Sequence, residues 1–282
     1  RIKRLILWVP CSHDGTTIQG VKTNMSVGTL VWKDDSHLTV NDMTFYVTYQ
    51  HEELIGIDST TTRFLLGKSR SMIEKVLTAL GGKTITHILD IGIFKGGSVV
   101  LYDQLFRPAK IVAVEFVSEP NKALAQYIQT HRRESEVKPY YGVNQADRRA
   151  MQKILSSEFL SAGIDLIVDD ASHLYAETRE TFNLSFPYLR PGGHYVIEDW
   201  AWAHWPGEYW QENNSYFGSK PALTNLLIEL MMLAASRSDL IADISVNHNM
   251  IIVTRGASPL SPGSFDIGEH YLLRGKQFQA WL

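Results

Sequence analysis

The feature that most constrains this chain is the stretch over residues 86–98, which reads as a buried strand, a glycine turn and the start of a helix. Ile88, Leu89 and Ile91 form the apolar run expected of a parallel strand that is covered on both faces. The glycines that follow allow the backbone to turn tightly and a ligand to approach the main chain. A helix is expected over residues 97–106, and its unpaired N–H groups would suit a carboxylate or phosphate at the turn.

The spacing of the glycines separates this turn from a dinucleotide-binding one. A dinucleotide fold has the pattern G-x-G-x-x-G after its first strand, whereas this chain has D-x-G-x-x-x-G-G. The pattern resembles motif I of class I S-adenosylmethionine (SAM)-dependent methyltransferases. The resemblance implies that SAM is the cofactor and that four residues of this stretch bind it, namely Asp90, Gly92, Gly96 and Ser98. Taken alone, the motif fits a glycine turn without a ligand equally well.

Strands and helices alternate through the middle of the chain. Further strands are expected over residues 110–115, 137–141, 164–169 and 193–198, and helices over residues 71–80, 119–132, 147–160 and 174–189. Such alternation implies a parallel sheet that is wound right-handedly. Gly81 and Gly82 are expected to end the helix that precedes the first strand.

The C-terminal part departs from this alternation. After a helix expected over residues 222–236, strands at 241–246 and 250–254 are separated only by Asn247-His248-Asn249. So short a link allows a hairpin but no crossover helix. A parallel sheet finished by an antiparallel hairpin is the methyltransferase arrangement, whereas a dinucleotide fold would add another parallel strand. The predicted fold class is therefore α/β, a Rossmann-like class I methyltransferase fold.

The first sixty residues predict a small β-rich extension. Strands are expected over residues 5–9, 27–32 and 44–49, with polar turn clusters between them. We therefore divide the chain into an N-terminal extension, residues 1–60, and a SAM-dependent methyltransferase domain, residues 61–282. The sequence does not show what the extension does, although such pieces often cover a site or contact another subunit.

Composition excludes several classes of function. A net charge of -3 provides no electrostatic footprint for nucleic acid. The single cysteine, Cys11, rules out an internal disulfide and is consistent with a reducing compartment. The longest apolar stretch, residues 226–235, is interrupted by Glu229 and is too short to span a bilayer. No signal-peptide pattern opens the chain, and its first residue is Arg rather than Met, as in a chain excised from a longer polypeptide. We therefore expect a cytoplasmic protein with neither nucleic-acid nor membrane partners.

Polar side chains stand where the predicted strands end, which is where ligands bind in such sheets. Glu115 ends the second strand, and a carboxylate there can accept hydrogen bonds from both ribose hydroxyls of SAM. Gln145 follows the third strand and is a candidate for contact with the adenine end, while Asp147 is expected to cap the next helix. Asp169, at the end of the fourth strand, is assigned to the cofactor as well.

The fourth and fifth strands carry the densest group of acids. Their ends hold Asp170, Glu198 and Asp199, and neighbouring strands lie about 4.8 Å apart. Carboxylates this close raise one another's pKa, and a divalent cation relieves the repulsion. An all-oxygen set suits Mg²⁺ or Mn²⁺ rather than Zn²⁺. These three acids are therefore predicted metal ligands, the alternative being two acidic loop ends that point into water. His173, three residues past Asp170, is the predicted general base, the alternative being a surface or capping residue.

These motifs together resemble a particular family. D-D-x-S-H after the fourth strand, E-D after the fifth and then H-W-P at residues 204–206 look like the metal-dependent O-methyltransferases of macrolide sugars. These are enzymes of the mycinamicin and tylosin type, related to the cephalosporin-hydroxylase-like group. The likeness covers about residues 68–255 and implies the same metal ligands and the same base. Asn144 stands where the family usually has an acid, and the aromatic residues over 200–210 predict an acceptor larger or flatter than a simple sugar.

The resemblance implies an activity, and two other readings stay open beside it. It implies a SAM- and magnesium-dependent O-methyltransferase of antibiotic or other natural-product biosynthesis, acting on a hydroxyl of a sugar or polyketide. It also suggests a homo-oligomer in which the extension contributes to neighbouring sites. The alternative is a non-catalytic SAM-fold domain that docks in a larger assembly, although such a domain has no need of converging acids. A nucleic-acid methyltransferase is a third reading, which the acidic net charge disfavours.

Overall fold

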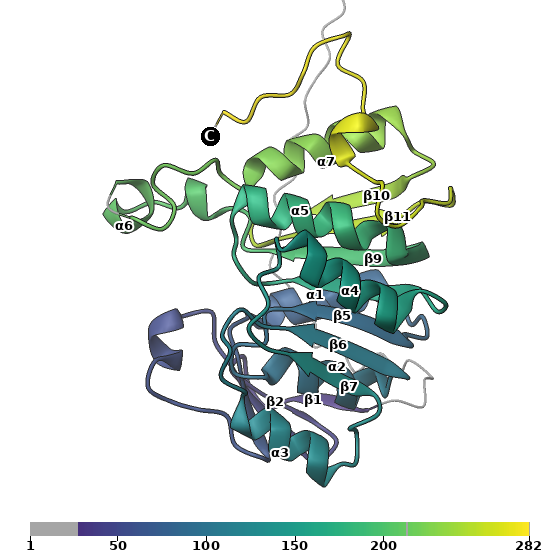
Figure 1. Cartoon of the computed structure of the whole chain (residues 1–282). Helices are drawn as coiled ribbons and strands as arrows, with labels where there is room; N and C mark the ends of the chain where they lie inside the picture. The colour runs from purple at the N-terminus through teal and green to yellow at the C-terminus, as the bar shows by residue number, and fades with distance from the viewer. Residues whose placement is uncertain (1–27, 213, 282) are drawn as a thin grey trace, which may run out of the picture.

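The centre of the molecule is a seven-stranded sheet, seen in a computed structural model that describes residues 28–212 and 214–281 (Figure 1). Its strands are β5 (His87–Ile91), β6 (Lys110–Val114), β7 (Val137–Tyr140), β8 (Ile164–Asp169), β9 (Leu189–Glu198), β10 (Ile241–Val246) and β11 (Met250–Arg255). They lie in the order β10-β11-β9-β8-β5-β6-β7, with β5 to β9 parallel and β11 antiparallel to both of its neighbours. The predicted α/β class and the C-terminal hairpin are confirmed.

Helices cover both faces of this sheet (Figure 1). They are α1 (Arg70–Leu80), α2 (Gly97–Phe106), α3 (Lys122–Thr130), α4 (Arg148–Phe159), α5 (Tyr175–Ser185) and α7 (Thr224–Ser236). The short helix α6 (Glu208–Gln211) lies away from the sheet (Figure 1), and the chain also has 3₁₀ turns η1 (His51–Leu54), η2 (Phe186–Tyr188), η3 (Trp202–His204) and η4 (Ile267–Glu269). Because side chains alternate along a strand, Ile111 and Ala113 of β6 join the core beneath α1, α2 and α3. Val112 and Val114 join the opposite core, beneath α4, α5 and α7. The continuous apolar runs of the central strands follow from this double cover.

A second, four-stranded sheet packs against α1 and α2 and shares their core. It consists of β1 (Leu30–Trp32), β2 (His37–Val40), β3 (Met43–Val47) and β4 (Arg63–Leu66). The first three strands are antiparallel, but β3 and β4 run parallel. The strands expected at 27–32 and 44–49 correspond to β1 and β3, and the strand expected at 5–9 lies outside the described residues.

β2 and β4 were not predicted. β4 lies in a threonine-rich, polar segment, yet Phe64, Leu65 and Leu66 are all buried. A β-carbon on Gly97, the first residue of α2, would lie 2.1 Å from the Leu65 carbonyl oxygen. This close approach requires glycine and sets β4 directly against the helix that follows the glycine turn.

The predicted element boundaries differ from the structure by a few residues. α3 begins at Lys122 rather than 119, because the Asn121 side chain accepts a hydrogen bond from the Leu124 N–H and caps the helix. The helix expected to reach residue 189 ends at Ser185, and β9 already begins at Leu189. Asp147 caps α4 as predicted. Among the described residues, none of the helices has the length and apolar character to cross a membrane.

Candidate functional site

The glycine turn between β5 and α2 is held against the loop that follows β8. Gly92 has a φ of 103°, and a β-carbon there would lie 2.1 Å from the Asp170 carbonyl oxygen. The Asp170 N–H also donates to the Ile91 carbonyl oxygen at 2.9 Å. Gly96, with a φ of 80°, begins α2. The predicted cofactor turn and the predicted metal loop are therefore in direct backbone contact.

Asp90 lies beneath this turn and is completely buried. Its Oδ2 accepts a hydrogen bond from the Ser98 hydroxyl at 2.6 Å, while Oδ1 has no hydrogen-bond partner among the described residues. Burial raises the pKa of Asp90 to about 7. Asp90 and Ser98, two of the four residues that the motif assigned to SAM, thus contact each other, and their role in cofactor binding stays a prediction.

Glu115, which follows β6, is hydrogen-bonded to the same turn. Its Oε2 accepts hydrogen bonds from the N–H groups of Ile93 (3.1 Å) and Phe94 (2.9 Å), and Oε1 accepts one from Val117 at 3.0 Å. A carboxylate has about four acceptor sites, so this one can also accept from ribose hydroxyls. Its predicted contact with the ribose therefore fits the structure but is not tested by it.

Gln145 and Asp169 form a buried pair behind the acidic loop. The Gln145 Nε2 donates to both Asp169 carboxylate oxygens, at 3.1 and 3.2 Å, and its Oε1 accepts from the Ser172 N–H at 2.9 Å. Burial raises the pKa of Asp169 to about 7. Gln145 therefore fixes the start of the loop that carries Asp170 and His173, an organising role that the sequence did not reveal.

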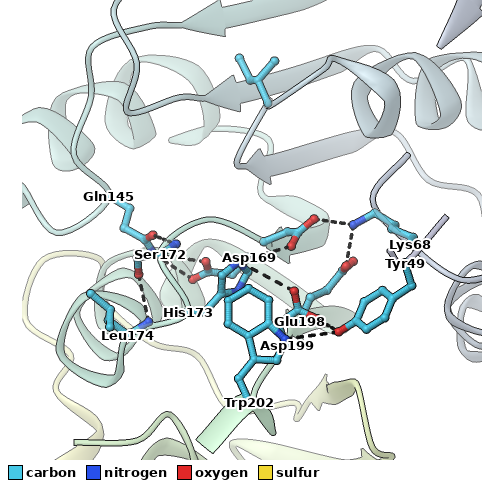
Figure 2. Close-up of polar contacts among 12 residues, drawn as sticks. Tyr49, Lys68, Gln145, Asp169, Ser172, His173, Leu174, Glu198, Asp199 and Trp202 are labelled. Carbon is cyan, nitrogen blue, oxygen red and sulfur yellow. Dashed lines mark hydrogen bonds and ion pairs between the residues drawn. The ribbon is translucent and has the colours of Figure 1, made fainter. Parts of the chain in front are cut away.

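Three acids meet at the carboxyl ends of β8 and β9, with a buried lysine among them (Figure 2). The Lys68 Nζ lies 2.6 Å from Asp170 Oδ2 and 2.6 Å from Glu198 Oε2. Its side chain is only 4% exposed. Burial lowers the pKa of Lys68, but the two carboxylates outweigh burial and hold the pKa well above its usual range. The ammonium is therefore charged and neutralises part of the acidic group.

Sequence reasoning missed Lys68, and it also missed Tyr49. The Tyr49 hydroxyl donates a hydrogen bond to Asp199 Oδ1. Burial and the negative charge of Asp199 raise the pKa of Tyr49, so the hydroxyl keeps its proton. Burial also raises the pKa of Asp199, to about 6. Both residues come from the small sheet, more than a hundred positions before the acids they contact, and no local pattern marks them.

His173 faces the acids from the side opposite Lys68 (Figure 2). Its Nε2 lies 3.9 Å from Asp170 Oδ1 and 3.9 Å from Asp199 Oδ2. The imidazole packs on Trp202, with ring centroids 4.3 Å apart. His173 and Asp199 have φ values of 55° and 60°, the left-handed region that side chains other than glycine rarely adopt. Such strained residues gather at functional sites.

One arrangement in the described part of the chain has the geometry of a metal site. Single ligand atoms of Asp170, His173 and Asp199 all lie within 4.8 Å of one another. The predicted ligand set named Glu198 in place of His173. Glu198 is adjacent and buried, and its Oε1 has no hydrogen-bond partner among the described residues. The carboxylate oxygens therefore fit a hard divalent cation, with His173 either a further ligand or a base.

Aromatic side chains of residues 202–217 form a cluster beside the acids. The ring centroids of Trp202 and Trp210 are 5.1 Å apart, and Phe217 lies 5.5 Å from Trp202. Trp205 joins the same cluster. Trp200 packs instead against the core beneath α4, α5 and α7, and its indole N–H donates to the Asn247 carbonyl oxygen at 2.7 Å. His204 is hydrogen-bonded to Thr224 Oγ1 at 2.6 Å.

Comparison with known proteins adds a family to this geometry. A family model described as a methyltransferase domain matches residues 89–200, the range that contains every predicted site residue. The mycinamicin VI 2''-O-methyltransferase of Micromonospora griseorubida is 27% identical over 188 residues, which are 60% of this chain and 44% of that protein. Demethylmacrocin O-methyltransferase of Streptomyces fradiae is 51% identical over 43 residues, which are 15% of this chain and 11% of that protein.

A solved structure of the MycE methyltransferase of the mycinamycin pathway, in complex with Mg, SAH and mycinamycin VI, superposes with a TM-score of 0.49. Its identity is 23%, and the match covers 66% of this chain and 49% of that one. The chain spans less than half the length of the curated relatives it matches. From the family match and these relatives, the chain carries a methyltransferase domain that is homologous, at modest identity, to the O-methyltransferases of macrolide sugars.

Proposed function

We propose that the protein is a SAM-dependent O-methyltransferase that requires Mg²⁺ or Mn²⁺ and methylates a hydroxyl of a glycosylated polyketide or similar metabolite. The observation that carries this proposal is the group formed by Asp170, Glu198, Asp199 and His173 next to the glycine turn. The relatives support the acceptor class, since they are named as methyltransferases of mycinamicin VI and demethylmacrocin.

The cofactor would bind over the glycine turn, where bound SAM supplies an electrophilic methyl group. Glu115 would accept hydrogen bonds from the ribose hydroxyls while it keeps the turn in place. Asp90 and Ser98 would support the turn from beneath, and the first N–H groups of α2 would be available to the cofactor because Gly96 provides no side-chain cap. Gln145 and Asp169, which are hydrogen-bonded to each other, would line the cofactor site beside the turn. The contact between Gly92 and Asp170 brings this cofactor site next to the acids.

Asp170, Glu198 and Asp199 would hold the divalent ion, which would supply Lewis-acid activation of the acceptor hydroxyl. The Glu198 Oε1 has no hydrogen-bond partner among the described residues, and Oδ1 of Asp170 and Oδ2 of Asp199 lie on the side of His173, so each acid has one oxygen that could bind the ion. The His173 Nε2, 3.9 Å from two of these carboxylates, would take the proton of the acceptor hydroxyl. The aromatic cluster would wall the acceptor side and fix the ring of the acceptor against the methyl group by packing.

The deciding assay measures transfer of radiolabelled methyl groups from SAM to a panel of glycosylated macrolides and other polyketides. We expect turnover to be lost in EDTA and regained on addition of Mg²⁺. Undiminished turnover in EDTA would contradict the metal requirement while leaving the methyltransferase assignment intact. The alternative of a non-catalytic docking domain predicts that calorimetry detects no SAM binding even at millimolar concentration.

The partners remain part of this proposal. The relatives support a small-molecule hydroxyl acceptor, since they are named as O-methyltransferases of mycinamicin VI and of a rhamnosyl tetracenomycin. The homo-oligomer predicted from the family resemblance is not tested by a single chain. Sedimentation analysis of the purified protein would decide it.

A further inference from the structure

The three predicted ligand carboxylates share a pattern of hydrogen bonding. Lys68 holds one oxygen of Asp170 and one of Glu198, and the Tyr49 hydroxyl holds Oδ1 of Asp199. The second oxygen of Glu198 has no hydrogen-bond partner among the described residues, and the second oxygens of Asp170 and Asp199 lie 3.9 Å from the His173 Nε2, beyond hydrogen-bond distance. Each acid is thus fixed on one side and open on the other.

Both donors come from the parallel pair of the small sheet. Tyr49 follows β3 and Lys68 follows β4. Because these strands are parallel, both residues lie at the carboxyl ends of the strands, on the same side of that sheet. Figure 2 shows them entering the acidic group together, opposite His173. The acids themselves lie at the carboxyl ends of the parallel strands β8 and β9 of the main sheet. The site is therefore built where the carboxyl ends of two parallel strand pairs face each other.

We propose that Tyr49 is a positioning residue for the divalent ion, which fixes Oδ1 of Asp199 so that Oδ2 is presented to the metal. This inference rests on the metal site proposed above. Among the described residues, Tyr49 is the one side chain that donates a hydrogen bond to the Asp199 carboxylate. Without it, the carboxylate would be free to rotate away from Asp170. Partners that orient a ligand in this way typically contribute about 10–100-fold to metal affinity.

Tyr49 allows a cleaner test than Lys68 because it carries no charge. Replacing Lys68 would change both the orientation of two carboxylates and the net charge beside the metal, and these effects oppose each other. Tyr49→Phe removes one hydroxyl and keeps the ring that packs on Trp205 at a centroid distance of 5.7 Å. Tyr46→Phe is a matched control, since the Tyr46 hydroxyl of β3 donates to the exposed Glu53 at 2.6 Å, away from the acids.

The experiment measures Mn²⁺ affinity by electron paramagnetic resonance, on the full chain without SAM or acceptor. We expect Tyr49→Phe to weaken Mn²⁺ binding about 10–100-fold and Tyr46→Phe to leave it unchanged. In parallel, the rise in melting temperature on adding Mg²⁺ should shrink in Tyr49→Phe alone. A residue with a purely structural role would lower the melting temperature equally with and without Mg²⁺.

The outcomes separate this inference from the proposed function. If the wild-type protein binds Mn²⁺ and Tyr49→Phe binds it equally well, the positioning role is wrong and the metal site stands. If the wild-type protein binds no Mn²⁺, the metal site is wrong and the role of Tyr49 falls with it. Asp199→Asn provides a second check, because the Tyr49→Phe effect should largely disappear in that background.

Discussion

His173 and Asp170 lie three residues apart in one loop, and we expect their removal to have different consequences. His173→Ala should lower turnover about 10²–10⁴-fold, the range for loss of a positioned general base, with SAM and Mg²⁺ affinity nearly intact. Asp170→Ala should instead weaken metal binding, because it removes a charged ligand that Lys68 also holds. High pH should rescue only the histidine variant, since hydroxide can replace a base but not a ligand.

Steady-state kinetics and Mn²⁺ titration of both variants check this pair of predictions. Normal turnover of His173→Ala at neutral pH would show that the base assignment is wrong. A large loss of Mn²⁺ affinity in the same variant would instead make His173 a ligand, as its position within 4.8 Å of Asp170 and Asp199 allows.

Loss of Lys68 should lower the stability of the folded protein. Its side chain is 4% exposed and that of Glu198 is 1% exposed, so Lys68→Met would leave a buried carboxylate without its cation. Breaking a buried pair in this way costs about 3–5 kcal/mol in the free energy of unfolding. Lys110→Met is the control, because Lys110 pairs with Glu158 in a more exposed position at the start of β6, and an exposed pair contributes about 0–1 kcal/mol. Urea denaturation compares the two variants, and equal losses would contradict a special role for Lys68.

At the scale of elements, Gly92 joins the turn after β5 to the loop after β8. Gly92→Ala combines a left-handed backbone with a β-carbon 2.1 Å from the Asp170 carbonyl oxygen, so we expect a loss of about 2–5 kcal/mol in unfolding free energy. SAM and Mn²⁺ affinity should fall together, because the turn and the acidic loop must move apart. Gly56→Ala separates the two causes, since Gly56 has a φ of 77° with no atom within 4 Å of the added carbon. Loss of SAM affinity without loss of Mn²⁺ affinity would show that the two loops are independent.

The elements that carry local signals were predicted well. The spacing of apolar residues and glycines predicted the strand, glycine turn and helix over residues 86–106 and the strand ends near Glu115 and Asp170. The short link between the last two strands predicted the hairpin. β4 was missed because its flanking residues are polar, although Phe64, Leu65 and Leu66 within it are buried. Lys68 and Tyr49 were missed for a related reason. Their roles depend on contacts across more than a hundred residues, which no local pattern encodes.

At the scale of the molecule, the two sheets act as one unit at the site. The small sheet shares a core with α1 and α2, and its parallel strands supply Lys68 and Tyr49 to acids carried by the main sheet. The boundary predicted at residue 60 falls between β3 and β4, two strands of the same sheet. The N-terminal part of the described chain is therefore a component of the proposed active site, and Lys68, which lies outside the matched range 89–200, supplies the positive charge beside the acids.

Buried acids should also make the stability of the whole molecule depend on pH. Burial raises the pKa of Asp90 to about 7, whereas a carboxyl of an unfolded chain titrates near about 3.9. Between these values the native state binds more protons than the unfolded state, so the free energy of unfolding contributed by Asp90 falls as the pH rises. The stabilising contribution is complete below the unfolded pKa and is lost as the pH passes the folded pKa.

Asp90→Asn isolates this contribution, because asparagine does not titrate and its side-chain oxygen can still accept the hydrogen bond from Ser98. We expect urea denaturation of the metal-free protein to show a shallower fall in stability between about pH 5 and pH 7.5 than in the wild type. Asp42→Asn, in the exposed turn between β2 and β3, should keep the wild-type slope. An Asp90→Asn slope equal to that of the wild type would mean that this carboxyl is ionised throughout the range, held by a positive charge such as that of Lys68, which lowers its pKa.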